Sequence, residues 1–222
     1  LIRHFKNQTM SAKFLTPLFS LYNKDRLEEI REACAMPYDA QNELLFEMLS
    51  DAASTEWGKR YRFSRIHSYD DFRQRLPLQQ YEDILPYVQR MMAGEGNLLW
   101  PGTCKYFVPA GEKNLASHLL PITRDALMDN FYEGIYDSMA MYLKDKGEDS
   151  NLFDSFSLWI GASKRDQVQR NLSNILIKEA PFPQSLFIRP QAPVNKSNAH
   201  SELDVLLEES QKGQVSNIQG RP

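Results

Sequence analysis

The sequence predicts an α/β fold, in which a helical N-terminal region leads into a mixed β-sheet. Apolar residues recur at helical spacing through most of the first hundred residues. Three short apolar runs with β character follow, at residues 105–108, 119–122 and 153–160. Between the second and third runs, Thr123 is placed to cap a long helix. Helices and strands that follow one another in this way favour an α/β protein.

The first two helices are expected at residues 18–34 and 40–53. Pro37 should interrupt the helical conformation between them, and Asp39 should cap the second helix. The expected buried face of the second helix consists of Leu44, Leu45, Met48, Leu49 and Ala52. Trp57 and Gly58 are expected to close this helix.

Two further short helices are expected before residue 100. Ser68, followed three residues later by Asp71, has the spacing of a helix cap. The residue before Pro77 should be extended, because proline disfavours a helical conformation in its predecessor. Residues 81–92 then predict a helix in which Pro86 is tolerated only in the first turn.

After Thr123 the sequence predicts a helix over residues 124–144, ended by Gly147. Residues 172–177 (LSNILI) indicate either a strand or a short helix, because six residues are too few for periodicity to decide. A short helix at 201–212 and a β-like run at 215–218 complete the pattern. The apolar stripes of the two helices are Leu127, Phe131, Ile135, Met139, Tyr142 and Leu143 in the first, and Leu203, Leu206 and Leu207 in the second.

A polar loop at residues 109–114 (PAGEKN) separates the first two β runs. A strand, a glycine-bearing loop, a second strand and a helix cap together can hold a phosphate group. Gly111 would let the backbone approach the ligand, and Lys113 would neutralise its charge. The alternative is a plain hairpin turn. Gly111 and Lys113 are therefore the candidate cofactor-binding residues.

Composition excludes several classes of function. A net charge of −3 and a pI near 5.9 argue against a nucleic-acid binder, which is normally basic. Two cysteines do not make a disulfide framework, which suits a reducing, cytoplasmic setting. The sequence contains no run of 18 apolar residues, so it predicts no membrane-spanning helix. The four histidines are scattered, without partners at metal-ligand spacing, so no metal site and no catalytic residue is assigned.

A series of short segments, taken in order and spacing, resembles the auxin-responsive acyl-acid amido synthetases of plants, of the jasmonate and auxin type, and their bacterial relatives. These enzymes belong to the adenylate-forming superfamily. The segments include Thr16-Pro17-Leu18, Thr55-x-Trp57-Gly58-Lys59-x-Tyr61-x-Phe63, Ser68-Tyr69-x-Asp71-Phe72-Arg73, Leu76-Pro77-Leu78-x-x-Tyr81-Glu82-Asp83-x-x-Pro86-Tyr87, Gly94-Glu95-x-Asn97-x-Leu99-Trp100-Pro101 and Leu120-Pro121-Ile122-Thr123. Later segments, LSNILI, Ala180-Pro181-Phe182 and Ser216-Asn217-Ile218-x-Gly220-x-Pro222, also fit the family.

The resemblance implies an incomplete N-terminal domain of an adenylate-forming, luciferase-like enzyme. Residues 1–100 would be its helix-rich segment and residues 101–222 the start of its α/β domain. The implied activity is an acyl-acid–amino-acid ligase that activates a carboxylic acid as an acyl-adenylate and then forms an amide. ATP and Mg²⁺ are the implied cofactors, and a small carboxylic acid and an amino acid, neither identified by the sequence, are the implied partners.

The chain departs from the family in the loop on which nucleotide binding depends. The family's Ser-Ser-Gly-Thr-Thr loop falls at residues 109–114, where this chain has no hydroxyl and places Glu112 beside Lys113. A carboxylate there would repel the phosphates of ATP. Because family members are also longer, we expect an N-terminal portion that is inactive by itself. A non-catalytic binding or assembly module, or half of a split enzyme completed by a second chain, are the alternatives, and self-association through Leu203, Leu206 and Leu207 is expected.

Overall fold

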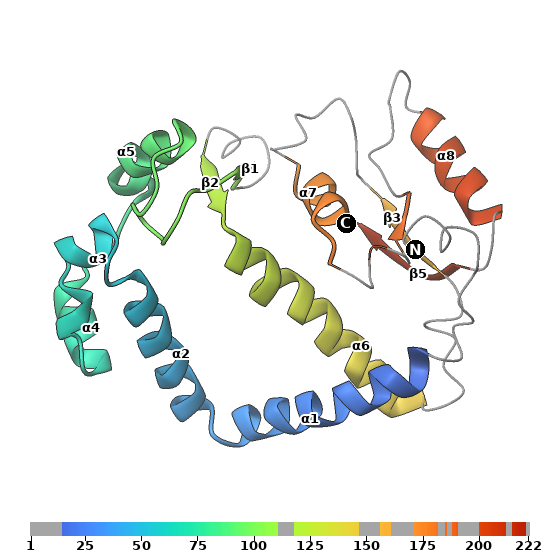
Figure 1. The fold of residues 1–222 in the computed structure, drawn as a ribbon, viewed down its shortest axis with the longest axis horizontal. Helices are drawn as coiled ribbons and strands as arrows, with labels where there is room; N and C mark the ends of the chain where they lie inside the picture. Colours follow the sequence, from blue (N-terminus) through green and yellow to red (C-terminus); the bar gives the residue numbers. More distant parts are fainter. Residues whose placement is uncertain are drawn as a thin grey trace, which may run out of the picture. The chain divides into compact units, whose positions relative to one another are not determined.

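The computed structural model describes residues 15–110, 118–146, 156–160, 171–181, 185, 188–190, 200–211 and 215–220. The chain forms two compact units. One is Ile30–Asn130, and the other joins Leu1–Glu29 to Phe131–Pro222. The division at residue 100 expected from the sequence stays a prediction. Helices dominate both units and the strands form two small sheets, in agreement with the α/β class (Figure 1).

The Ile30–Asn130 unit holds the end of one long helix, four shorter helices and a β-hairpin. The elements are α1 (Leu15–Ala35, shared with the other unit), α2 (Pro37–Ala52), α3 (Glu56–Arg60), a 3₁₀ turn (Phe63–Arg65), α4 (Tyr69–Arg75), α5 (Tyr81–Met92), β1 (Tyr106–Pro109) and β2 (Leu119–Ile122). Trp57 lies in the core of this unit, where its ring meets the Tyr87 ring edge to face, with centroids 5.1 Å apart. The other buried core residues are Leu49, Ala52, Phe63, Ile66, Val88, Met91, Leu98, Cys104 and Phe107.

Helix α2 differs from its prediction at both its start and its buried face. It begins at Pro37, which suits a first helical position because the missing N–H would have no partner there. Asp39 therefore lies in the first turn instead of capping the helix. Leu49 is buried, but Leu44 and Met48 are 57% and 48% exposed, so the buried face is narrower than predicted.

Trp57 and Gly58 do not close α2 as predicted, because both lie inside α3. Thr55, which is fully buried, caps that helix: its Oγ1 accepts a hydrogen bond from the Gly58 N–H at 2.9 Å. The same hydroxyl donates to the carbonyl oxygen of Ala52 at 2.7 Å. One side chain therefore joins the end of α2 to the start of α3.

The predicted cap of α4 is confirmed, since the Asp71 N–H donates to Ser68 Oγ at 3.0 Å. Leu76 is extended before Pro77, as expected. Pro86 was expected only in a first turn, but it lies inside α5, five residues beyond the start at Tyr81. The first turn of α5 is fixed by its own acidic residue instead, because Asp83 accepts the Gln80 N–H at 2.8 Å.

The second unit contains a parallel three-stranded sheet with the order β4 (Ile188–Arg189), β3 (Phe156–Ile160), β5 (Val215–Gly220). Its helices are α7 (Leu172–Lys178) and α8 (His200–Gln211), and α6 (Glu133–Lys146), which a π-helical segment (Ala126–Tyr132) precedes. LSNILI is thus a helix, and Asn171 caps it by accepting the Asn174 N–H at 3.1 Å. The strand predicted at 153–160 is confirmed from Phe156; residues 153–155 lie outside the described part, as does Gly147.

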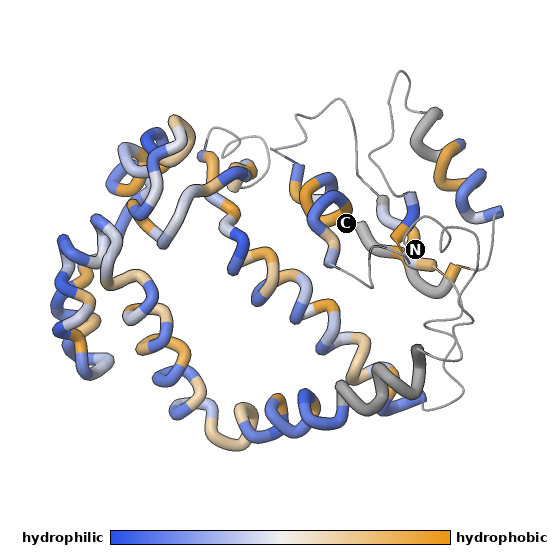
Figure 2. Tube along the Cα trace, viewed as in Figure 1, coloured by the Kyte–Doolittle hydropathy of each residue, from blue (hydrophilic) through white to orange (hydrophobic). Residues whose placement is uncertain are grey.

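The predicted stripe along residues 124–144 is only partly buried. Leu127 and Leu143 are buried, whereas Tyr142 is 45% exposed. Tyr132, the last residue of the π-helical segment, is buried instead and donates to the carbonyl oxygen of Leu176 at 2.6 Å. Figure 2 shows hydrophilic and hydrophobic residues alternating along α6.

In α8, Leu206 is buried, whereas Leu207 is 51% exposed. The expectation that Leu206 contributes to an unpaired apolar face is therefore wrong, and the side chain of Leu203 lies outside the described residues. No helix in the described ranges is both long and apolar enough to cross a membrane.

Candidate functional site at the β1–β2 hairpin

The predicted arrangement of strand, loop, strand and helix cap is present. Strands β1 and β2 pair antiparallel, from Tyr106 opposite Ile122 to Pro109 opposite Leu119. One more backbone bond, from the Ala110 N–H to the His118 carbonyl at 2.7 Å, closes the ladder before the loop. Directly after β2, Thr123 Oγ1 accepts the Ala126 N–H at 3.1 Å, as a helix cap does.

The two residues predicted to hold a cofactor, Gly111 and Lys113, lie in the seven-residue connection 111–117, outside the described residues. Glu112 lies there too. Their part in binding a phosphate stays a prediction. The structure does establish that this connection joins two paired strands, so both predicted readings, a phosphate loop and a plain hairpin turn, start from the same backbone.

Tyr81, the first residue of α5, fixes the end of the hairpin that lies next to the loop. Its hydroxyl donates to the carbonyl oxygen of Leu119 at 3.0 Å and accepts the Leu119 N–H at 2.9 Å. Its ring stacks on the imidazole of His118, with centroids 4.2 Å apart and planes at 15°. Tyr81 thus satisfies both backbone polar groups of a strand residue that lies next to the loop.

Sequence reasoning did not find the pairing of Tyr81 with His118. In the sequence, Tyr81 belongs to the family-like series and begins a predicted helix, and His118 is one of four scattered histidines. The two are 37 positions apart and neither belongs to a short motif that would link them. The position of Tyr81 at the start of a helix gives no local signal that its hydroxyl reaches a strand.

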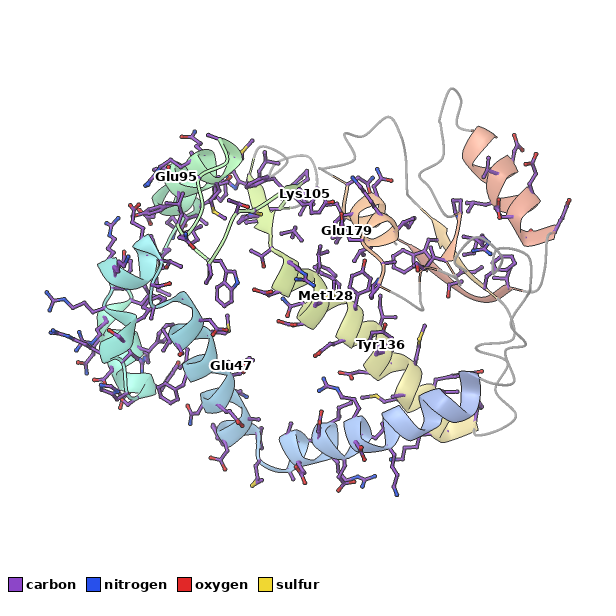
Figure 3. The ribbon with its side chains drawn as sticks, in the orientation of Figure 1. Glu47, Glu95, Lys105, Met128, Tyr136 and Glu179 are labelled. Atoms are coloured by element: carbon purple, nitrogen blue, oxygen red, sulfur yellow. The ribbon has the colours of Figure 1, made fainter. Side chains whose placement is uncertain are left out.

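The described polar groups at the loop end of the hairpin do not fit a phosphate. The Ala110 and Leu119 N–H groups are used within the hairpin and by Tyr81. Lys105, just before β1 (Figure 3), carries its amine 4.8 Å from the centroid of the Tyr106 ring. A nucleotide phosphate would therefore depend on donors from residues 111–117.

Cys104 offers no activated nucleophile at the hairpin. Cys104 is buried below the hairpin, and its thiol donates to the carbonyl oxygen of Tyr106 at 3.2 Å. Burial raises the pKa of the Cys104 thiol, so the group stays protonated at neutral pH and unreactive. Within the described residues, no group of three or more His, Cys, Asp or Glu side chains is placed to hold a metal ion.

Two residues that the family resemblance includes, Glu95 and Asn97, help to shape the segment between α5 and β1. Arg90 of α5 pairs with Glu56 at 2.8 Å and with Glu95, which Figure 3 marks. Hydrogen bonds to Arg90 hold the pKa of both carboxyl groups below their ordinary value. Asn97 has a left-handed backbone, and its side chain accepts the Gly102 N–H at 2.9 Å. These residues form a turn, so their role is to position the strand that follows.

Comparison with known proteins gives one result for most of the chain. The model of the GH3 family N-terminal domain matches residues 26–209. The matched range includes the β1–β2 hairpin, the helices α2 to α7 and most of α8. None of the curated proteins matches the chain.

Proposed function

Because the chain belongs to the GH3 family, the auxin-responsive acyl-acid amido synthetases, we propose that it carries the N-terminal scaffold of an ATP-dependent acyl-acid–amino-acid ligase. In this proposal the scaffold is that of the adenylate-forming enzymes. The observation that supports it best is the β1–β2 hairpin, which lies inside the family match and runs directly into the helix capped by Thr123.

In this proposal ATP, held with Mg²⁺, would give its adenylyl group to a small carboxylic acid with release of pyrophosphate, and the amine of an amino acid would then take the acyl group with release of AMP. The chain's own part is to fix the two strands that residues 111–117 connect. Tyr81 holds the start of β2, where it bonds Leu119 and stacks on His118. Gly111 and Lys113 are the residues that would approach and neutralise a phosphate.

We further propose that this chain does not catalyse the reaction by itself. The described backbone N–H groups at the loop end of the hairpin are already hydrogen-bonded within the protein. The loop sequence offers a carboxylate, Glu112, where hydroxyl donors are needed. The same observations favour the second candidate function, a non-catalytic binding or assembly module on this scaffold. In a split enzyme, a second chain would supply the missing donors.

Pyrophosphate release tests the catalytic part of the proposal. The chain is incubated with ATP, Mg²⁺, an amino-acid mixture and a panel of small carboxylic acids. We expect release no faster than in a sample of heat-denatured chain. Release that requires both ATP and one of the acids would contradict inactivity and show that the chain adenylates a carboxylic acid.

Thermal stabilisation by MgATP separates the ligase scaffold from the non-catalytic module. If the loop still holds a nucleotide, MgATP raises the unfolding temperature, and Lys113→Ala removes that shift. Lys59→Ala, an exposed lysine of α3, is the matched control and should leave it unchanged. A chain whose unfolding temperature does not respond to millimolar MgATP has lost the nucleotide site, which would reject the ATP-dependent function and favour the binding module.

A further inference from the structure

Helix α2 presents an apolar row that the core does not use. Met36, at the cap of α2, and Leu44 and Met48 within it are 56%, 57% and 48% exposed. Leu44 and Met48 are about one turn apart and so are neighbours on the helix surface, and Met36 lies about two turns before Leu44. Leu49 and Ala52, which face the core, are 5% and 3% exposed. The exposed row therefore borders the face that stabilises the unit, because Ala52 follows Met48 by four residues.

A row of carboxylates runs beside the apolar row. Asp39, Glu43, Glu47 and Asp51 are all exposed and follow one another every four residues, and α2 contains no lysine or arginine. Figure 3 marks Glu47 on this helix. None of the four makes an ion pair with a residue in the described part of the chain. Like charges at this spacing repel each other, so the row disfavours the helix that carries it.

The two rows are neighbours on the helix surface. Leu44 and Glu47, and Met48 and Asp51, are each three residues apart, the spacing at which helical side chains touch. The surface is thus a strip of flexible apolar side chains with a negative border. Unbranched methionine side chains adapt to different partners, and are common on binding surfaces for helices.

We propose that this face of α2 binds a basic amphipathic helix of a protein partner. Leucine or similar side chains of that helix would cover Leu44 and Met48, and its lysines or arginines would lie along the carboxylate row. A second copy of the chain is a poor fit, because two α2 helices would bring their acidic rows together. Nucleic acids and anionic membranes are repelled by the same row.

A labelled model peptide tests the proposal with the full chain. The probe is a helix of leucine and lysine, about 18 residues long so that it is helical when bound, with leucines at helical spacing. A matched peptide replaces every lysine by glutamate. Fluorescence anisotropy should show saturable binding of the lysine peptide, weakened at high salt, and none of the glutamate peptide.

Variants of exposed residues then place the binding on α2. Glu43→Lys with Glu47→Lys should weaken binding at least tenfold, and so should Leu44→Ser with Met48→Ser at unchanged net charge. The matched control, Asp204→Lys with Glu208→Lys, makes the same charge change at the same spacing on α8 and should have little effect. Circular dichroism confirms that each variant keeps its helix content.

Three results would overturn the proposal. The first is no saturable binding of the lysine peptide, and the second is equal weakening by the α2 and α8 charge reversals, which would mean attraction to net charge alone. The third is light scattering that shows a dimer which Leu44→Ser with Met48→Ser dissociates, because the occupant would then be a second copy.

Discussion

At the scale of single residues, a Cβ atom at Gly58 would lie 2.0 Å from the carbonyl oxygen of Ala52, whereas one at Gly134 would meet nothing within 4 Å. Gly58→Ala therefore has to move backbone, and should lower the free energy of unfolding by at least the roughly 1–3 kcal/mol that overpacking costs. Gly134→Ala, in the exposed part of α6, should raise it by about 0.5–1 kcal/mol.

Urea unfolding followed by circular dichroism measures both variants. The pair is informative because the chemical change is identical and both glycines are helical. If the two substitutions shifted the unfolding midpoint in the same direction, the close approach of Gly58 to Ala52 would not be what limits this position.

The sequence indicated that Gly58 matters but not why. It stood in the family-like series, and was interpreted as a helix stop, since glycine commonly ends helices. Its actual constraint is a contact with Ala52, and that contact exists only because Thr55 turns α2 into α3. A constraint set by the path of the backbone leaves no mark in the sequence beyond the glycine itself.

At the scale of elements, the start of α4 links a helix cap to pH. Asp71 accepts the His67 N–H at 3.1 Å, and its own N–H donates to Ser68 Oγ. The bond from His67 lowers the pKa of Asp71 below its ordinary value of 3.8. The contribution of Asp71 to stability is then complete above the pKa of the unfolded chain, and is lost as pH falls through the lowered folded pKa.

Asp71→Asn should therefore cost stability at pH 6, and the cost should shrink as the pH falls below about 4. The measurement is the urea midpoint of both proteins between pH 6 and pH 2.5. Asp70→Asn, on the neighbouring residue, removes the same charge and serves as the control. Parallel pH curves for the unmodified chain and Asp71→Asn would show that the bond to His67 does not stabilise the folded form.

The elements that the sequence predicted correctly are those with local causes. Ser68 with Asp71, and Thr123 with Ala126, are caps whose donor and acceptor lie three residues apart. Burial was less predictable, because it depends on which neighbour covers a side chain. Leu44 of α2 is as apolar as Leu49, but only Leu49 reaches the core. The periodicity of α2 was correct and its buried width was not.

At the scale of the whole molecule, the candidate site was predictable in position but not in support. The two strands, the loop between them and Thr123 follow one another in the sequence. Tyr81 of α5 bonds Leu119 of β2, 38 positions further along the chain, a contact that only the tertiary fold creates. For the same reason, the sequence did not show that the unit containing the parallel sheet also takes in Leu1–Glu29.

That unit is discontinuous, and one arginine joins its two parts. Arg26 of α1 donates from Nε to Asp137 Oδ1 at 2.7 Å and from Nη2 to Oδ2 at 3.1 Å, across 111 positions. Glu133 lies 3.6 Å from the same guanidinium group. Hydrogen bonds to Asp137 raise the pKa of Arg26, so the guanidinium group keeps its charge at every ordinary pH.

Arg26→Met keeps the apolar stem and removes the charge, and leaves Asp137 and Glu133 facing each other. We expect the free energy of unfolding to fall by about 1 kcal/mol, because the Arg26–Asp137 pair is bidentate but partly solvated. By hydrogen exchange, protection of amides in 15–29 and in α6 should fall about fivefold, with little change in Ile30–Asn130. Glu29→Gln, at the exposed i,i+3 contact, is the control and should change little. A double-mutant cycle with Asp137→Asn isolates the pair; a coupling energy of zero would mean that α1 is held in its unit by apolar contacts and not by Arg26.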